Sequence, residues 1–222
     1  MIVAERKKIP ELLNIVKAHK KILVLGCGTC VTVCLAGGER EVGIISSALR
    51  IASRLQGIDL AVEELTIERQ CDNVFIEQAA DAIERNDAVL SLGCGAGVQA
   101  IAERYRNKPV YAGLDTTFIG ILEEQGIWTE KCAACGSCVL HEYGGVCPVT
   151  RCAKRMLNGP CGGSREDRCE VRPELPCAWQ LIYARLKEIG QIDRLRQIAP
   201  PKNWHRSLDG GQRLVVRQDH RI

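Results

Sequence analysis

Thirteen cysteines are the residues of this sequence whose number and spacing point most directly to chemistry. Eight of them fall between residues 132 and 177, and the other five fall between residues 27 and 94. An odd total leaves one cysteine unpaired in any disulfide scheme, and thiols in the cytosol are kept reduced. The sequence therefore predicts that these cysteines bind metal or carry redox chemistry.

The later cysteines begin with a C-x2-C-x2-C motif at Cys132, Cys135 and Cys138, the spacing of the first three ligands in a bacterial ferredoxin run. The Cys-Pro pair that usually follows after three residues comes here after eight, at Cys147. Four further cysteines complete the group: Cys152, Cys161, Cys169 and Cys177.

Eight cysteines suffice for two sites of four ligands, and the sequence leaves open which cysteine belongs to which site. Two iron-sulfur clusters satisfy this count, and so does one cluster with one tetrahedral zinc, for which His141 is a substitute ligand. The C-x2-C-x2-C spacing favours a cluster, because one short loop then reaches three corners of a cube. Zinc alone is the alternative for this segment.

The five earlier cysteines lie near the ends of predicted strands. Cys27 and Cys94 each stand in the sequence Leu-Gly-Cys-Gly directly after an apolar run, and Cys71 lies in a loop after another strand. Cys30 and Cys34 are four residues apart at the start of a helix, and therefore on one face. Because the carboxyl ends of parallel strands share one edge of a sheet, we expect four of these five to hold a first [4Fe-4S] cluster.

The glycines around Cys27 and Cys94 allow the backbone to pass close to a bulky cluster. The segments GCGTCV and GCGAGV also match part of a dinucleotide fingerprint, with Glu63 or Glu64 as the acid that binds the ribose. Valine replaces the last glycine of that fingerprint in both segments, which argues against nucleotide binding. A third interpretation is that the five cysteines are buried apolar thiols with no ligand.

Apolar runs that alternate with amphipathic segments must position the early cysteines. We predict strands over residues 21–26, 59–65, 87–93 and 109–113, and helices over 11–19, 40–56, 73–85 and 98–106. This alternation predicts an α/β fold in which helices cover both faces of a Rossmann-like parallel sheet. The sequence Asp115-Thr116-Thr117 predicts a helix cap after the last of these strands.

The composition changes near residue 129. Strand patterning stops there and cysteines accumulate, as expected where metal sites replace an apolar core. We predict an α/β domain over residues 1–128, a small cysteine-rich metal-binding module over 129–178, and a helix with an extended basic tail over 179–222. The segment from residue 200 onward is too short and too basic for a core of its own, and we expect it to dock on a partner.

Length and composition exclude several classes of protein. A chain of 222 residues with 46% hydrophobic residues can bury a core. Its apolar runs are much shorter than the roughly 20 residues that span a bilayer, and it begins without a signal-peptide pattern. We therefore expect a cytoplasmic protein without membrane insertion. The formal charge of +3 gives no indication of nucleic-acid binding, and no paired acid, base or nucleophile predicts a catalytic site.

Several segments together resemble one known family: LGCGTCVTVCLAGGEREV (25–42), LGCGAGVQ (92–99), KCAACGSC (131–138), GGVCPVTRCAK (144–154), LNGPCGG (157–163) and RCEV (168–171). The sequence resembles the small zinc- and iron-sulfur-containing subunit of two-subunit methylenetetrahydrofolate reductases from acetogenic and related anaerobic bacteria. That family also occurs as a carboxyl-terminal domain fused to the reductase. The resemblance covers most of residues 1–190.

The resemblance implies electron transfer to a flavin-containing catalytic subunit, which reduces 5,10-methylenetetrahydrofolate to 5-methyltetrahydrofolate in the acetyl-CoA (Wood-Ljungdahl) pathway. The upstream donor would be ferredoxin, a nicotinamide-oxidising subunit or a heterodisulfide-reductase-like complex. The implied cofactors are two [4Fe-4S] clusters, with zinc as a further metal. The alternative is a zinc-stabilised scaffold subunit of the same kind of complex, without a redox role.

Overall fold

The structure is a computed structural model that describes residues 1–207 and 211–220. Residues 208–210 and 221–222, which belong to the predicted tail, lie outside the described residues. The chain divides into two compact units, Met1–Trp128 and Thr129–Ile222. The first unit contains the five early cysteines and the second contains the eight later ones.

A four-stranded parallel sheet forms the centre of the first unit, with the strand order β3-β2-β4-β5. The strands are β2 (Lys21–Cys27), β3 (Ala61–Ile67), β4 (Ala88–Ser91) and β5 (Val110–Ala112). Every residue of β2 after Lys21 is buried, as expected when a continuous apolar run becomes a central parallel strand. The predicted α/β class and the parallel sheet are confirmed.

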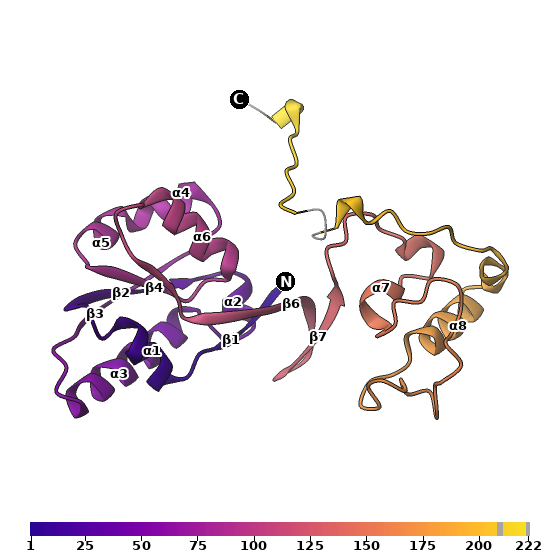
Figure 1. The fold of residues 1–222 in the computed structure, drawn as a ribbon, viewed down its shortest axis with the longest axis horizontal. Helices are drawn as coiled ribbons and strands as arrows, with labels where there is room; N and C mark the ends of the chain where they lie inside the picture. The colour runs from indigo at the N-terminus through magenta and orange to yellow at the C-terminus, as the bar shows by residue number, and fades with distance from the viewer. Residues whose placement is uncertain (208–210, 221–222) are drawn as a thin grey trace. The chain divides into compact units, whose positions relative to one another are not determined.

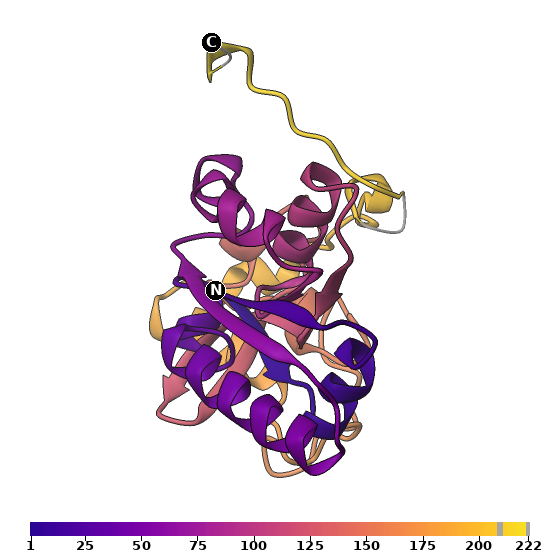
Figure 2. The same ribbon diagram turned by 90° about the vertical axis from the view of Figure 1, so that its left-hand side faces the viewer.

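Helices pack on both faces of this sheet (Figures 1 and 2). One face is covered by α1 (Ile9–Val16) and α3 (Glu39–Leu55); the other is covered by α4 (Asn73–Ile76), η1 (Glu77–Ala79), α5 (Ala80–Glu84) and α6 (Gly95–Arg104). Side chains of β2 alternate between these layers: Ile22 and Val24 join the first core, and Leu23 and Leu25 join the second.

A second sheet, with the order β1-β6-β7, was not predicted from the sequence. In it, β1 (Ile2–Arg6) pairs antiparallel with β6 (Leu114–Glu124), and β7 (Ile127–Cys132) follows β6 after a turn at Gly126. The predicted helix cap at Asp115-Thr116-Thr117 is wrong, because these residues lie in β6 and face β1. Threonine favours both N-caps and strands, so the local signal was ambiguous.

The second unit consists mainly of loops around a small apolar core. Its short elements are η2 (Leu140–Glu142), α7 (Pro148–Arg151), α8 (Ala178–Glu188), η3 (Ile192–Arg196), η4 (Trp204–Arg206) and η6 (Gln218–His220). Its core cluster comprises Tyr143, Cys177, Trp179, Ile182 and Leu186, so α8 supplies most of it. Within the described part of the chain, no helix has the length and apolar character needed to span a bilayer.

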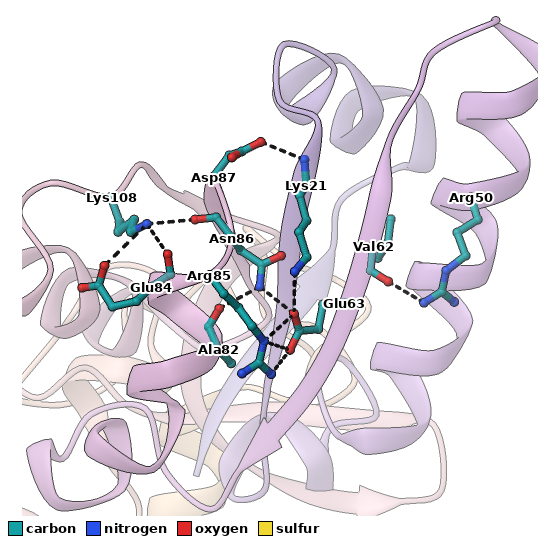
Figure 3. Close-up of polar contacts among 10 residues, drawn as sticks. All are labelled: Lys21, Arg50, Val62, Glu63, Ala82, Glu84, Arg85, Asn86, Asp87 and Lys108. Carbon is teal, nitrogen blue, oxygen red and sulfur yellow. Dashed lines mark hydrogen bonds and ion pairs between the residues drawn. The ribbon is translucent and has the colours of Figure 1, made fainter.

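An ionic cluster ties the strand starts of the parallel sheet together (Figure 3). The carboxylate of Glu63 accepts hydrogen bonds from Arg85 Nε at 2.9 and 3.0 Å and from Asn86 Nδ2 at 2.8 Å. Lys21 Nζ lies 3.5 Å from the same carboxylate. The hydrogen bonds from Arg85, together with Asn86 and Lys21, lower the pKa of Glu63 to about 2.

We expect Glu63→Gln to lower the free energy of unfolding of the first unit by about 1–2 kcal/mol at neutral pH, since the pair is partly screened by solvent. The folded-state pKa lies below the ordinary value of 4.5, so this stability is present above pH 4.5 and is lost as the pH falls toward about 2. Denaturant unfolding of the metal-free wild type and variant at several pH values measures the difference in their free energies of unfolding. Glu68→Gln is the control. A stability difference between the wild type and Glu63→Gln that stays constant with pH would contradict the prediction.

Candidate metal centres

The carboxyl edge of the parallel sheet brings together chain segments that carry three cysteines. The chain leaves β2 for β3 on one side and then returns to β4 on the other side, so a topological switch point lies between β2 and β4. Open α/β sheets bind their ligands at such a point. Cys27 is the last residue of β2, Cys94 is the N-cap of α6 after β4, and Cys71 lies in the loop after β3.

The thiols of Cys27, Cys71 and Cys94 are near enough to influence one another. Burial raises the pKa of the Cys71 thiol, and the neighbouring Cys94 and Cys27 raise it further. Thiolates that repel one another in this way are stabilised when a cation or a metal cluster binds between them. The first turn of the ten-residue helix α6, directly after Cys94, also favours negative charge in front of its amides.

The remaining two cysteines of this unit differ sharply in environment. Cys30 begins the short helix α2 (Cys30–Val33) and is half-buried. Cys34 is 6% exposed, and its thiol donates to the carbonyl oxygens of Ala4 at 3.7 Å and Val31 at 3.6 Å. Burial raises the pKa of Cys34, which keeps it a neutral donor. Of the two, Cys30 has the more accessible thiol, whereas the Cys34 thiol is already engaged by backbone carbonyls.

At two positions of this site, Gly28 and Gly95, the surrounding atoms of the chain leave room for a larger residue than glycine. A Cβ at Gly28 would lie 3.4 Å from its nearest neighbour, and one at Gly95 would lie 3.7 Å away, which are ordinary contacts. Neither residue has the left-handed backbone that favours glycine. Packing within the chain therefore does not explain the glycines directly after Cys27 and Cys94, and a close approach of the backbone to a group bound by these cysteines would.

The nucleotide alternative receives no support from the geometry. A ribose-binding acid should lie at the carboxyl end of its strand, but Glu63 and Glu64 lie in the first part of β3. Glu63 is engaged by Arg85, and Glu64 pairs with Arg50 at 2.6 Å.

Four cysteines of the second unit line one small cavity. They are contributed by a loop after α7, by the turn region that follows, and by the N-cap of α8: Cys152, Cys161, Cys169 and Cys177. Lys154 and Glu170 also line the cavity and form an ion pair with each other. Four sulfur donors around one space match the ligand number of a [4Fe-4S] cluster or a structural zinc.

The C-x2-C-x2-C loop is strongly curled. Ala134 has φ +49° and Gly136 has φ +77°, so left-handed residues alternate with the cysteines. The Ala134 N–H donates to Cys132 Sγ at 3.3 Å, as an amide does toward a metal-bound sulfur. A non-glycine residue held in this conformation costs free energy, and such strain is concentrated at functional sites.

The tail holds this loop through three residues, Lys202, Arg206 and Arg213, which we call the tail clamp. Lys202 Nζ donates to Ser137 O, and an Arg213 guanidinium N–H donates to Ala134 O. The backbone of Arg206 passes so near Gly136 that a Cβ there would lie 2.4 Å from Arg206 O. The predicted docking of the tail on a partner remains a prediction, but part of the tail already supports the cysteine loop.

Gly136→Ala tests the tail clamp. We expect it to destabilise the second unit by more than the roughly 1–2 kcal/mol that a left-handed alanine costs, because the methyl group also displaces Arg206. Gly145→Ala is the matched control: Gly145 lies in the same unit and is also left-handed, with φ +86°, but has nothing within 4 Å. Thermal unfolding and metal content of the two variants measure the difference in their stability. Equal effects of the two substitutions would contradict the proposed role of the tail clamp in holding the cysteine loop.

Cys147 and His141 complete the predicted ligands of this unit. Cys147 is the N-cap of α7, and its thiol donates to Thr150 Oγ1 at 3.6 Å. His141 Nε2 lies 2.9 Å from Glu142 Oε1, and its side chain is 71% exposed. Neither residue lines the four-cysteine cavity.

All thirteen cysteines are free thiols. Among the described residues, no three His, Cys, Asp or Glu side chains are arranged as the ligands of a single metal ion. A four-iron cluster is larger than one ion, and its ligands lie correspondingly farther apart. The sulfur-rich donor sets match the ligand type of such a cluster.

Sequence reasoning did not identify several residues that contact these sites. Thr29 Oγ1 lies 3.4 Å from Cys27 Sγ, and Thr116 Oγ1 accepts from the Gly95 N–H at 2.9 Å. Glu170 Oε1 lies 3.6 Å from Cys161 Sγ. Only Thr29 carried a usable signal, because it lies between two candidate ligands.

A comparison with protein families gives one match. The family described as "Methylene-tetrahydrofolate reductase C terminal" matches residues 111–205, which is less than half of the chain. All eight cysteines of the second unit lie inside the match, and the five of the first unit lie outside it. No curated protein and no solved structure matches the chain. Residues 111–205 are therefore related to the carboxyl-terminal region of methylene-tetrahydrofolate reductases.

Proposed function

We propose that this chain is an iron-sulfur electron-transfer subunit of a methylenetetrahydrofolate reductase complex. The observation that carries the proposal is the grouping of free cysteines: one set at the switch point of the parallel sheet, and another around a single cavity inside the family match. Cysteines gathered in this way and left unpaired are typical of metal and redox sites.

In the first unit, the proposed cluster ligands are Cys27, Cys30, Cys71 and Cys94. Cys34 acts as a structural thiol, because its proton is already donated to backbone carbonyls. In the second unit, we assign one site to the cavity set (Cys152, Cys161, Cys169 and Cys177) and the other to Cys132, Cys135, Cys138 and Cys147. One of these two sites holds a cluster, and the other is suited to a second cluster or to zinc.

When bound, such clusters accept and pass on single electrons. The residues of this chain hold the sulfur ligands, exclude water from Cys27 and Cys177, and place helix amino-termini beside Cys94 and Cys177. The partner we propose is a separate flavin-containing catalytic subunit, in keeping with the reductase family of residues 111–205. The upstream donor is ferredoxin, a nicotinamide-oxidising subunit or a heterodisulfide-reductase-like complex.

Metal and sulfide analysis of anaerobically purified protein, with paramagnetic resonance of the reduced sample, tests the proposal. We expect about eight iron atoms and about eight sulfides per chain together with zinc if the third site is structural, and about twelve of each if the third site holds a cluster. About four irons with zinc would leave one cluster and keep the electron-transfer role. Zinc without acid-labile sulfide, after supply of iron and sulfide, would replace the proposal with a zinc-stabilised scaffold.

A further inference from the structure

We propose that Gln70 is the positioning residue of the cysteine site in the first unit. Its side-chain amide joins the three chain segments that carry Cys27, Cys71 and Cys94. The inference rests on the proposed cluster at these cysteines. It adds a residue that sets the distances between the ligands without binding the cluster itself.

The amide nitrogen of Gln70 fixes the end of β2. Gln70 directly precedes Cys71 and is 1% exposed. Its Nε2 donates to the carbonyl oxygen of Leu25 at 2.8 Å, two residues before Cys27. The same carbonyl accepts from the Leu92 N–H at 2.8 Å, so β2, β4 and the Cys71 loop meet at one oxygen.

The amide oxygen of Gln70 fixes the segment that leads to Cys94. The hydroxyl of Ser91, the last residue of β4, donates to Gln70 Oε1 at 2.5 Å. Ser91 Oγ in turn accepts from the Gly93 N–H at 3.1 Å. This chain of buried hydrogen bonds ends at the residue before Cys94, so displacement of the amide would move that ligand as well.

The orientation of the amide is determined by its partners. The Leu25 carbonyl can only accept, so it must face the NH2 group. The amide oxygen then faces the Ser91 hydroxyl and can only accept, so Ser91 must donate its proton to it while its own oxygen accepts from the Gly93 N–H. An ionised carboxylate of the same length could only accept, so it would offer no donor to the Leu25 carbonyl.

Two glycines are required by the Gln70 side chain. A Cβ at Gly93 would lie 2.4 Å from Gln70 Oε1, and a Cβ at Gly97 would lie 2.7 Å from Gln70 Cβ. The glycines on either side of Cys94 thus differ in function. Gly93 makes room for the glutamine, whereas a Cβ at Gly95 would make only an ordinary contact with Thr116.

Gln70→Glu in the full chain tests the inference. The variant keeps the shape of the side chain but replaces the NH2 group by an oxygen. The buried site must then either hold a carboxylate that has no donor for the Leu25 carbonyl or take up a proton at neutral pH, and both cost free energy at the ligand segments. Residues that orient metal ligands typically change metal affinity by about 10- to 100-fold. We therefore expect iron to leave this cluster for a chelator about 10- to 100-fold faster, with an altered paramagnetic resonance signal.

The cluster concerned is identified as the spectral component that is missing from Cys71→Ser. Gln78→Glu makes the same chemical change at an exposed position, and Ile83→Val weakens the core of the same unit. Both controls should release iron at the wild-type rate. Wild-type release and signal in Gln70→Glu would overturn the inference, as would equally fast release in Ile83→Val. If Cys71→Ser lacks no component, the proposed cluster in this unit is wrong instead.

Discussion

Replacement of Cys71 by serine is expected to remove one whole cluster, about four iron atoms and four sulfides per chain, while Cys34→Ser removes none. Cys71 lies with Cys27 and Cys94 at the switch point, where burial and then the neighbouring Cys94 and Cys27 raise the pKa of the Cys71 thiol. A serine hydroxyl does not ionise at neutral pH, so it cannot supply the missing ligand charge.

Cys34→Ser is the matched control because it makes the same atomic change seven residues after Cys27. The hydroxyl of a serine can donate to the same carbonyl oxygens of Ala4 and Val31 that the thiol now uses. The unit should therefore fold and keep its cluster. Iron and sulfide content, together with the visible absorption near 400 nm that bleaches on reduction, measure both variants.

Three outcomes separate the assignments. Loss of the cluster in Cys34→Ser but not in Cys30→Ser would exchange the roles of these two cysteines. Full iron content in Cys71→Ser would show that the switch point holds no cluster. Loss in Cys30→Ser and Cys71→Ser, with retention in Cys34→Ser, is the result that the burial and hydrogen bonds of Cys34 lead us to expect.

The parallel sheet was predictable because its signals are local. The apolar run of β2 and the alternation of strands and amphipathic helices can be seen within short windows of sequence. The pairing of β1 with β6 could not be seen in this way. Ile2 pairs with Ile119, far along the chain, and β6 begins with residues that also suit a helix cap.

The choice between Cys30 and Cys34 also depends on a contact between residues that are far apart in the sequence. Their spacing places both on one face of a helix, and nothing in the sequence distinguishes them. The distinction comes from Ala4, which β1 carries to the Cys34 thiol. Because β1 was not predicted, the carbonyl that engages this thiol could not be foreseen.

In the second unit, the number of cysteines predicts enough ligands for two sites, and this stays a prediction; the membership of each site could not be predicted from the sequence. The cavity set includes Cys152 and Cys177, which are separated by a segment without regular helices or strands. Loop geometry of this kind depends on turns with left-handed backbone, such as those at Gly159 and Gly162. Such turns permit many paths, so spacing alone does not show which cysteine returns to which site.

The second prediction with a large expected effect is that the second unit needs its metal in order to fold. Its core cluster contains five buried residues, whereas the two core clusters of the first unit contain nineteen and nine. Apolar burial on this scale rarely stabilises a unit of this length alone. Bound metal supplies on the order of 10 kcal/mol in small metal-dependent domains, as much as the whole stability of a typical domain.

We therefore expect Cys169→Ser, or removal of metal by a chelator, to unfold the second unit and leave the first unit folded. Hydrogen exchange read by mass spectrometry measures both in one experiment. Amides of α8 should lose their protection, because Cys177 and Trp179 at its start lie at the four-cysteine cavity. Amides of β2 and β4 should keep theirs, since the apolar core around those strands is independent of the cavity.

Ser164→Ala is the control for this prediction. Ser164 lines the same cavity, and its hydroxyl accepts one long hydrogen bond, 3.3 Å from Gln180 Nε2, so its loss should leave α8 protected. Unchanged protection in Cys169→Ser would mean that the cavity cysteines are not needed for folding, and that α8 and its neighbours are stable without metal. Loss of protection in both units would instead mean that the β2 core depends on the metal of the second unit.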